Sequence, residues 1–94
     1  MKTSTPVPTL VSVVVIEDDE ALRETFRTAL ELEDYQVLEA PDGMSGLKQL
    51  RAHPSSLVVL LDWLMPGMDG ARVLDAIAND APVARRHAYI LMSA

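Results

Sequence analysis

The 94-residue sequence predicts a small α/β domain built on one open, doubly wound parallel sheet. Its apolar runs are rich in Val, Ile and Leu and show no polar alternation, which is typical of strands buried on both faces. Segments with helical spacing of apolar residues separate these runs. Strands that alternate with helices pair in parallel through right-handed crossovers. The length suits one small domain.

Composition narrows the possible functions. Hydrophobic residues make up 49% of the chain, enough for a core, and the net charge of −6 argues against contact with nucleic-acid backbones or anionic membranes. The absence of Cys excludes disulfides, thiolate metal sites and a cysteine nucleophile. No apolar run approaches the roughly 18 residues of a membrane span. We therefore expect a cytoplasmic domain, with residues 1–9 as a flexible leader and no signal peptide.

The first half of the chain predicts two strand–helix units. A strand over residues 10–16 precedes a helix capped by Asp19, whose carboxylate can accept free N–H groups of the first turn. The expected inner face of that helix consists of Leu22, Phe26, Ala29 and Leu30, and the expected solvent face of Arg23, Glu24, Arg27 and Glu31. A second strand is expected over residues 35–40. Asp42 then caps a helix that carries Met44, Leu47 and Leu50 inward and contains Gly46, which costs about 1 kcal/mol relative to Ala.

The second half predicts two further strands. The third covers residues 56–62, and Asp69 caps the helix after it, whose inner side chains are Val73, Leu74 and Ile77. A short ordered turn is expected over residues 83–86 and the fourth strand over residues 87–93. His53 and His87 stand among polar residues without metal-ligand spacing, so we expect both to be solvated.

Acidic residues follow two of these strands. Glu17 and Asp18 come after the first strand, and Asp62 ends the third. If the strand order begins 2-1-3, these carboxylates meet at the carboxyl edge of the sheet, where doubly wound sheets bind ligands. Three acids at one point repel one another, so the arrangement calls for a divalent cation with oxygen ligands, of which Mg²⁺ is the first candidate. Ser93, after the fourth strand, would lie on the same edge.

Three blocks of sequence carry a family resemblance. They are the acidic block at residues 14–23, the pattern D-x-x-M-P-x-M-D-G at residues 62–70, and the ending I-L-M-S-A at residues 90–94. Together they resemble the receiver domain of bacterial two-component response regulators, over residues 10–94. The resemblance implies a flavodoxin-like fold with strand order 2-1-3-4.

The resemblance also implies roles for individual residues. Asp62 matches the phosphoacceptor, and Ser93 matches the hydroxyl that senses the phosphoryl group. Asp18 would bind Mg²⁺ directly and Glu17 through water, with the backbone carbonyl of Leu64 as a further ligand. The implied function is to accept a phosphoryl group from a sensor histidine kinase or phosphotransfer protein, as a signalling domain and not an enzyme.

The resemblance is incomplete at its C-terminal end. Receivers continue with a helix, a strand and a helix beyond the point that matches Ala94, and that strand carries a Lys that pairs with the phosphoryl group. We therefore expect a partial receiver over residues 10–94, or a fragment of a longer protein. Its fourth strand would be an open edge, which favours self-association.

Two other functions stay open. A degenerate receiver could act as an interaction module without phosphoryl cycling. The missing Lys supports this interpretation, and the intact acidic residues argue against it. A Mg²⁺-dependent aspartyl phosphatase would need a second Asp as acid and base two residues after the nucleophile. Leu64 occupies that position and cannot protonate a leaving group.

Overall fold

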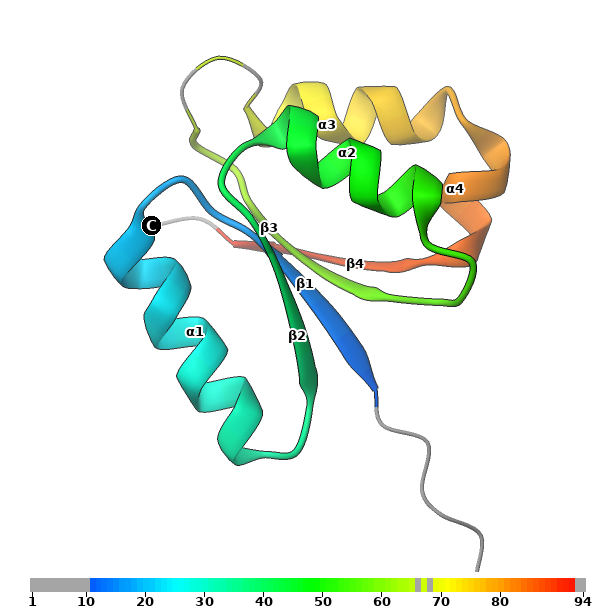
Figure 1. The fold of residues 1–94 in the computed structure, drawn as a ribbon. Helices are drawn as coiled ribbons and strands as arrows, with labels where there is room; N and C mark the ends of the chain where they lie inside the picture. Colours follow the sequence, from blue (N-terminus) through cyan, green and yellow to red (C-terminus); the bar gives the residue numbers. More distant parts are fainter. Residues whose placement is uncertain (1–10, 66, 68, 93–94) are drawn as a thin grey trace, which may run out of the picture.

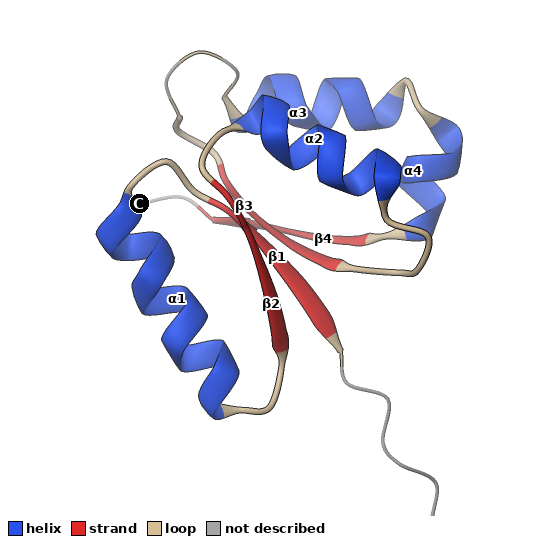
Figure 2. Cartoon of the chain, in the orientation of Figure 1, coloured by secondary structure: helices blue, strands red, loops and turns tan. Residues whose placement is uncertain are grey.

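The computed structural model describes residues 11–65, 67 and 69–92, and it has the expected α/β architecture (Figure 1; Figure 2). In this part of the chain the strands form one parallel sheet in the order β2-β1-β3-β4. The elements are β1 (Ser12–Ile16), α1 (Glu20–Leu32), β2 (Gln36–Ala40), α2 (Gly43–Ala52), β3 (Val58–Asp62), α3 (Gly70–Ala78), α4 (Ala81–Arg86) and β4 (Ala88–Met92). The predicted fold and strand order are confirmed.

The register of the sheet brings the ends of β1 and β3 side by side. Ile16 pairs with Ala40 of β2 on one side and with Leu61 of β3 on the other. The apolar run of β1 is buried throughout, as expected for a central strand covered on both faces. The residues that directly follow Ile16 and Leu61 therefore start from neighbouring positions at the carboxyl edge.

The helices divide unequally between the two faces of the sheet. Figure 1 shows α1 on one side and α2, α3 and α4 on the other. The main core fills the space between the sheet and the three helices, with side chains from each helix: Leu47, Leu50, Val73, Ile77 and Val83. Among the described helices, none is long and apolar enough to cross a membrane.

The inner face of α1 is only partly covered, which corrects the sequence analysis. Phe26 and Leu30 are half-buried, and no residue of the helix is fully buried. Leu22 is 42% exposed and Ala29 is also exposed, so these two do not lie on a covered face. The physical reason is that α1 is the one described helix on this face. Beside it, the sheet leaves a hollow lined by Val11, Val13, Leu30, Tyr35, Val58, Leu60 and Ile90.

The orientation of α2 was predicted in part. Leu47 and Leu50 are buried as expected, but Met44 is 65% exposed, so the prediction that it points into the core was wrong. Met44 is the second residue of the helix, and it lines a surface hollow over α2 instead of the core. Gly46 allows the close contact, because a Cβ there would lie 2.5 Å from Cδ1 of Ile16. This contact explains why a glycine is present in the middle of the helix.

His87 is buried, which also corrects the sequence analysis. It is 7% exposed, and both ring nitrogens make hydrogen bonds. The Leu57 N–H donates to Nδ1 at 2.9 Å, and Nε2 donates to the Leu50 carbonyl at 3.0 Å. An N–H can only donate and a carbonyl can only accept, so these partners fix the neutral tautomer with its proton on Nε2. His87 thus joins the end of α2 to the starts of β3 and β4.

Replacing His87 should destabilise the fold. His87→Ala leaves a buried backbone N–H and a buried carbonyl without their partner, so we expect the free energy of unfolding to fall by about 2–3 kcal/mol. Urea denaturation measures this change. His53→Ala is the matched control and should change the free energy by less than about 0.5 kcal/mol, since its ring makes an exposed hydrogen bond to the nearby Ser55 carbonyl. Equal effects of the two substitutions would contradict the assigned role.

The uncovered sheet face predicts marginal stability or self-association of this chain. The described strand β4 carries no charge and no Pro to block pairing at its open edge, and Ile90 and Leu91 are 51% and 47% exposed. We expect sedimentation velocity to show association that increases with protein concentration, or thermal unfolding to show a broad transition. Ile90→Lys should reduce the association. A compact monomer with a sharp thermal transition would contradict this prediction.

Candidate functional site

Three carboxylates come together at the carboxyl edge of the sheet. Glu17 follows β1, Asp18 is the next residue, and Asp62 ends β3. One carboxylate oxygen from each lies within 4.8 Å of the others. Glu17 is buried, Asp18 is exposed and Asp62 is intermediate. The strand order thus produces the juxtaposition that the sequence predicted, and we call these three residues the acidic cluster.

Glu17 is the buried member of the acidic cluster. Only 2% of its surface is exposed, and this burial raises the pKa of its carboxyl group from 4.5 to about 7, with the carboxylates of Asp62 and Asp18 acting in the same direction. The Asp19 N–H donates to Oε1 at 3.1 Å and opposes the increase. A bound cation would offset the repulsion between these carboxylates.

The loop that carries Glu17 is held on both sides. The Glu17 N–H donates to the Ala40 carbonyl of β2 at 3.1 Å. Asp19 caps α1 as predicted, since its carboxylate accepts from the Leu22 N–H at 3.0 Å. The loop is therefore hydrogen-bonded to β2 at its start and to the first turn of α1 at its end.

The loop after β3 fixes Asp62. The Leu64 N–H donates to Oδ1 of Asp62 at 3.2 Å, which orients the carboxylate. The Trp63 N–H donates to the Met92 carbonyl at 2.8 Å, so this loop is tied to the end of β4. The side chain of Leu64 is 67% exposed, and its backbone carbonyl stays a predicted metal ligand. Ser93 lies outside the described residues, and its role as a phosphoryl sensor also stays a prediction.

Gly70 is a site residue whose role the sequence analysis missed. A Cβ at this position would lie 2.6 Å from the Trp63 Cα and 2.8 Å from the Asp62 carbonyl oxygen, closer than real contacts allow. Only glycine therefore lets the start of α3 pack against the end of β3, where its N–H donates to the Trp63 carbonyl at 3.0 Å. The signal was the final glycine of the D-x-x-M-P-x-M-D-G pattern.

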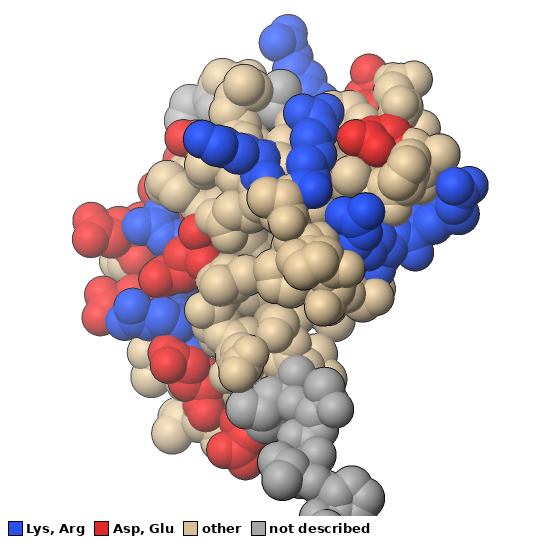
Figure 3. Space-filling view, turned by 45° about the vertical axis from the view of Figure 1, so that its right-hand side comes forward, with Lys and Arg blue, Asp and Glu red and all other residues tan. Residues whose placement is uncertain are grey.

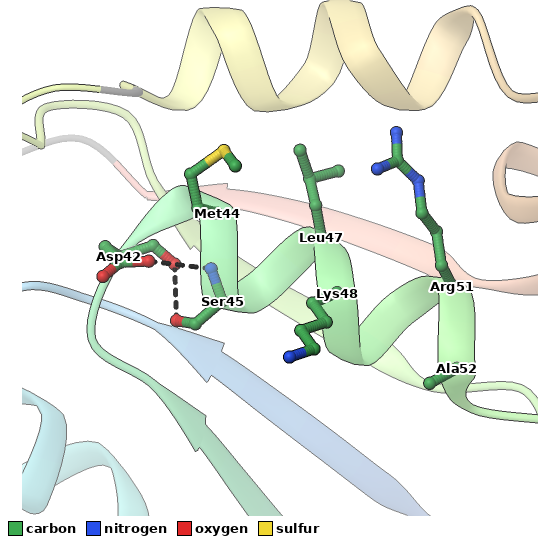
Figure 4. A pocket seen from close by; sticks show the side chains of 7 residues that line it. All are labelled: Asp42, Met44, Ser45, Leu47, Lys48, Arg51 and Ala52. Carbon is green, nitrogen blue, oxygen red and sulfur yellow. Dashed lines mark hydrogen bonds between the residues drawn. The ribbon is translucent and has the colours of Figure 1, made fainter.

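A large hollow of the described surface lies away from these acids. One of about 710 Å³ lies over α2 and is lined by Asp42, Met44, Ser45, Leu47, Lys48, Arg51 and Ala52 (Figure 4). Figure 4 shows Met44, Leu47 and Arg51 on one side of the helix, with Asp42 bonded to Ser45 at its start. No member of the acidic cluster lines this hollow. The acidic cluster is the stronger candidate for the functional site, because it brings three possible metal ligands together.

Charge is also distributed unevenly over the surface. Figure 3 shows acidic side chains concentrated on the α1 side, whereas Lys and Arg dominate over the layer formed by α2–α4. The acidic cluster is at the N-terminal end of α1. The surrounding negative potential therefore favours the approach of a cation and opposes the approach of an anionic group on its own.

Comparison with known families identifies the domain. A sequence model described as "Response regulator receiver domain" matches residues 13–94. The chain belongs to the response regulator receiver family. The acidic cluster therefore lies in the receiver domain of a two-component system, as the resemblance in the sequence implied.

Curated relatives of this receiver are longer proteins. It is 38% identical to the transcriptional regulatory protein CseB of Streptomyces coelicolor over 71 residues, which are 76% of this chain and 30% of that protein. It is 45% identical to the probable transcriptional regulatory protein NarL of Mycobacterium tuberculosis over 78 residues, which are 81% of this chain and 36% of that protein. The chain thus spans about a third of the length of these relatives.

Solved structures share the receiver fold. A CheY-like response regulator receiver domain from Methanospirillum hungatei superposes with a TM-score of 0.78 at 30% identity, covering 85% of this chain and 62% of that one. The receiver domain of the Francisella response regulator 1452 gives the same TM-score at 25% identity, covering 89% and 66%. The observed strand order agrees with the fold that the family implied.

The raised pKa of Glu17 predicts how stability depends on pH. The metal-free folded domain binds the proton of Glu17 more tightly than the unfolded chain does. Protonation of Glu17 therefore contributes its full stabilisation of the fold below pH 4.5, and this contribution is lost as pH rises through about 7. Glu17→Gln stays uncharged and keeps an oxygen for the Asp19 N–H. We expect it to be more stable than the wild type above pH 7 by on the order of 3 kcal/mol, and about equal to it near pH 4.5.

Urea denaturation in metal-free buffer at both ends of this range measures the effect. Glu20→Gln is the matched control, because Glu20 is exposed in the first turn of α1 and is not part of the acidic cluster. It should change stability by a similar small amount at each pH. A Glu17→Gln effect independent of pH would show that the carboxyl group does not titrate as described.

Proposed function

We propose that this receiver accepts a phosphoryl group on Asp62 with the help of Mg²⁺. In this proposal Asp18 and Asp62 bind the ion directly, Glu17 acts through water, and the backbone carbonyl of Leu64 completes the protein ligands. The donor is a sensor histidine kinase or a phosphotransfer protein, and the cytoplasm is the expected location. The observation that carries the proposal is the position of three carboxylates within 4.8 Å at the ends of adjacent central strands.

The donor set fits Mg²⁺. The acidic cluster contains only oxygen ligands, and Mg²⁺ is a hard cation that prefers carboxylate and carbonyl oxygens and keeps several waters. The exposure of Asp18 leaves room for those waters and for a donor. The buried Glu17, whose raised pKa reflects its surroundings, would become easier to ionise beside a cation.

Phosphoryl transfer at this site would proceed by in-line attack. An oxygen of Asp62 forms a bond to phosphorus while the bond between phosphorus and the donor breaks, and the leaving group takes a proton from solvent. Mg²⁺ would supply charge neutralisation on the transferred oxygens. The Leu64 N–H holds Oδ1 of Asp62 at 3.2 Å and so keeps the carboxylate in one orientation before attack.

The product would be an acyl phosphate that alters the charge of this edge. We propose that Ser93 donates a hydrogen bond to it, as the family resemblance implies. The hydrogen bond from the Trp63 N–H to the Met92 carbonyl supports this proposal, because it joins the loop after Asp62 to the residue just before Ser93. A charge change at Asp62 would then act on the end of β4.

The alternatives have less support. A receiver that only binds a partner would not need three carboxylates held together against their repulsion. An aspartyl phosphatase would need an acid at the position of Leu64. The proposed role is therefore that of a phosphoacceptor that is modified once in each signalling event, without turnover of a substrate. Acidic charge around the site argues against nucleic-acid binding by this domain.

Incubation with acetyl phosphate and Mg²⁺, followed by intact mass measurement, tests the proposal. We expect one phosphoryl adduct on the wild type, none on Asp62→Asn, and none when a chelator removes the metal. Asp69→Asn is the matched control. Asp69 caps α3 by accepting from the Arg72 N–H at 3.0 Å, and Asn caps equally well, so this variant should keep the adduct.

The opposite outcome has a clear reading. A wild type that gains no adduct, while its circular dichroism shows a folded domain, would favour the interaction module without phosphoryl cycling. An adduct that persists in Asp62→Asn would place the acceptor at a different residue.

A further inference from the structure

Arg23 contacts the loop that carries the acidic cluster. Its Nη1 donates to the Glu17 carbonyl at 2.9 Å, and its Nε lies 3.5 Å from Oε1 of Glu39 on β2. The side chain is 16% exposed, whereas that of Arg27, one turn further along α1, is 39% exposed. The prediction that both arginines take the solvent face was therefore wrong for Arg23.

We infer that Arg23 is a positioning residue for the cation site, because its guanidinium fixes the backbone that presents Glu17 and Asp18. The inference rests on the proposed function of the acidic cluster and adds a residue to it. Arg23 touches no carboxylate of the cluster among its recorded contacts and acts through the Glu17 carbonyl.

The hydrogen bonds of Glu17 show why this contact matters. Its N–H donates to the Ala40 carbonyl, its Oε1 accepts from the Asp19 N–H, and its carbonyl accepts from Arg23. The Arg23 bond is the one that fixes the peptide plane between Glu17 and Asp18. The Cα–Cβ bond of Asp18 turns with this peptide plane, and packing does not hold the exposed side chain, so the position of its carboxylate depends on the plane. Loss of the bond would leave the peptide free to turn and would move the Asp18 carboxylate.

The location of Arg23 has an electrostatic cost, which the stability of α1 alone does not explain. It lies near the N-terminus of α1, where the helix dipole disfavours a cation. Glu39 offsets that cost, since its two oxygens contact Arg23 and Arg27. The planar guanidinium reaches a carbonyl and a carboxylate at once, which a lysine ammonium on a flexible stem does less well.

Positioning and simple charge effects predict opposite results. A positive charge beside a cation site weakens cation binding, so if Arg23 acted only through its charge, its removal would tighten Mg²⁺ binding. If it acts by positioning, its removal weakens Mg²⁺ binding. The sign of the change therefore separates the two roles.

The experiment compares Arg23→Met with Arg27→Met in Mg²⁺ titrations. Trp63 is next to Asp62 and 37% exposed, so its fluorescence can report binding. We expect Arg23→Met to raise the Mg²⁺ dissociation constant about tenfold, as is typical for residues that orient metal ligands. At saturating Mg²⁺ its rate of phosphorylation by acetyl phosphate should return to near the wild-type rate. Arg27→Met loses a contact to the same Glu39 but none to Glu17, and should stay close to the wild type.

The remaining outcomes are distinct. An unchanged or lower dissociation constant in Arg23→Met would overturn the inference while leaving the proposed function intact. A wild type that shows no Mg²⁺ response in fluorescence or in thermal stability would overturn both. If Arg23→Met does not fold, Arg23→Lys can replace it, because lysine keeps the positive charge but lacks the planar guanidinium that bonds to two groups at once. It should then weaken Mg²⁺ binding, and wild-type affinity in that variant would overturn the inference.

Discussion

The parallel pairing of β1 with β3 is the constraint on which the acidic cluster depends. These strands are neighbours although α1, β2 and α2 separate them in the sequence, and their register ends with Ile16 beside Leu61. The carboxylates that follow cannot avoid one another, because buried apolar residues hold both strands in place. The free energy of core burial thus maintains an arrangement of charges that electrostatics alone would separate.

Two close helix–strand contacts complete this arrangement. Gly46 lets α2 approach the side chain of Ile16, and Gly70 lets α3 begin directly against the backbone of Asp62 and Trp63. Gly46 lowers the intrinsic stability of α2, and both glycines permit packing that a methyl group would prevent. The ends of β1 and β3 are consequently held by α2 and α3, which lie on the same side of the sheet. The carboxyl edge that carries the acidic cluster stays open.

Much of the fold could be predicted because the deciding signals are local. Apolar runs gave the strands, and the caps of three helices were predicted from single acids that the structure confirms: Asp19, Asp42 and Asp69. The meeting of Glu17 with Asp62 followed from strand order. What could not be predicted depends on contacts distant in sequence. His87 bonds to Leu57 and Leu50, and the exposure of Leu22 depends on how few helices share its face of the sheet.

The role of Arg23 could not be predicted for a different reason, because its partner Glu17 is only six residues away in the sequence. On a helical wheel it falls among solvent-facing residues, and only the path of the preceding loop brings the Glu17 carbonyl within reach. Family resemblance does not reveal it either, because the resemblance concerns the acids themselves. Residues that support a site through the backbone are therefore found from the structure more readily than from the sequence pattern.

The hydrogen bonds of His87 also have a consequence for the order of events in folding. They join residues 30 and 37 positions apart, so they cannot form until β4 has docked against β3 and α2. The chain loses conformational entropy when such long loops close, and it does so before these hydrogen bonds form. The bonds of His87 therefore form late on the folding pathway. A loss of these bonds would then act mainly by accelerating unfolding, and His87 would govern how long the native domain persists more than how fast it is reached.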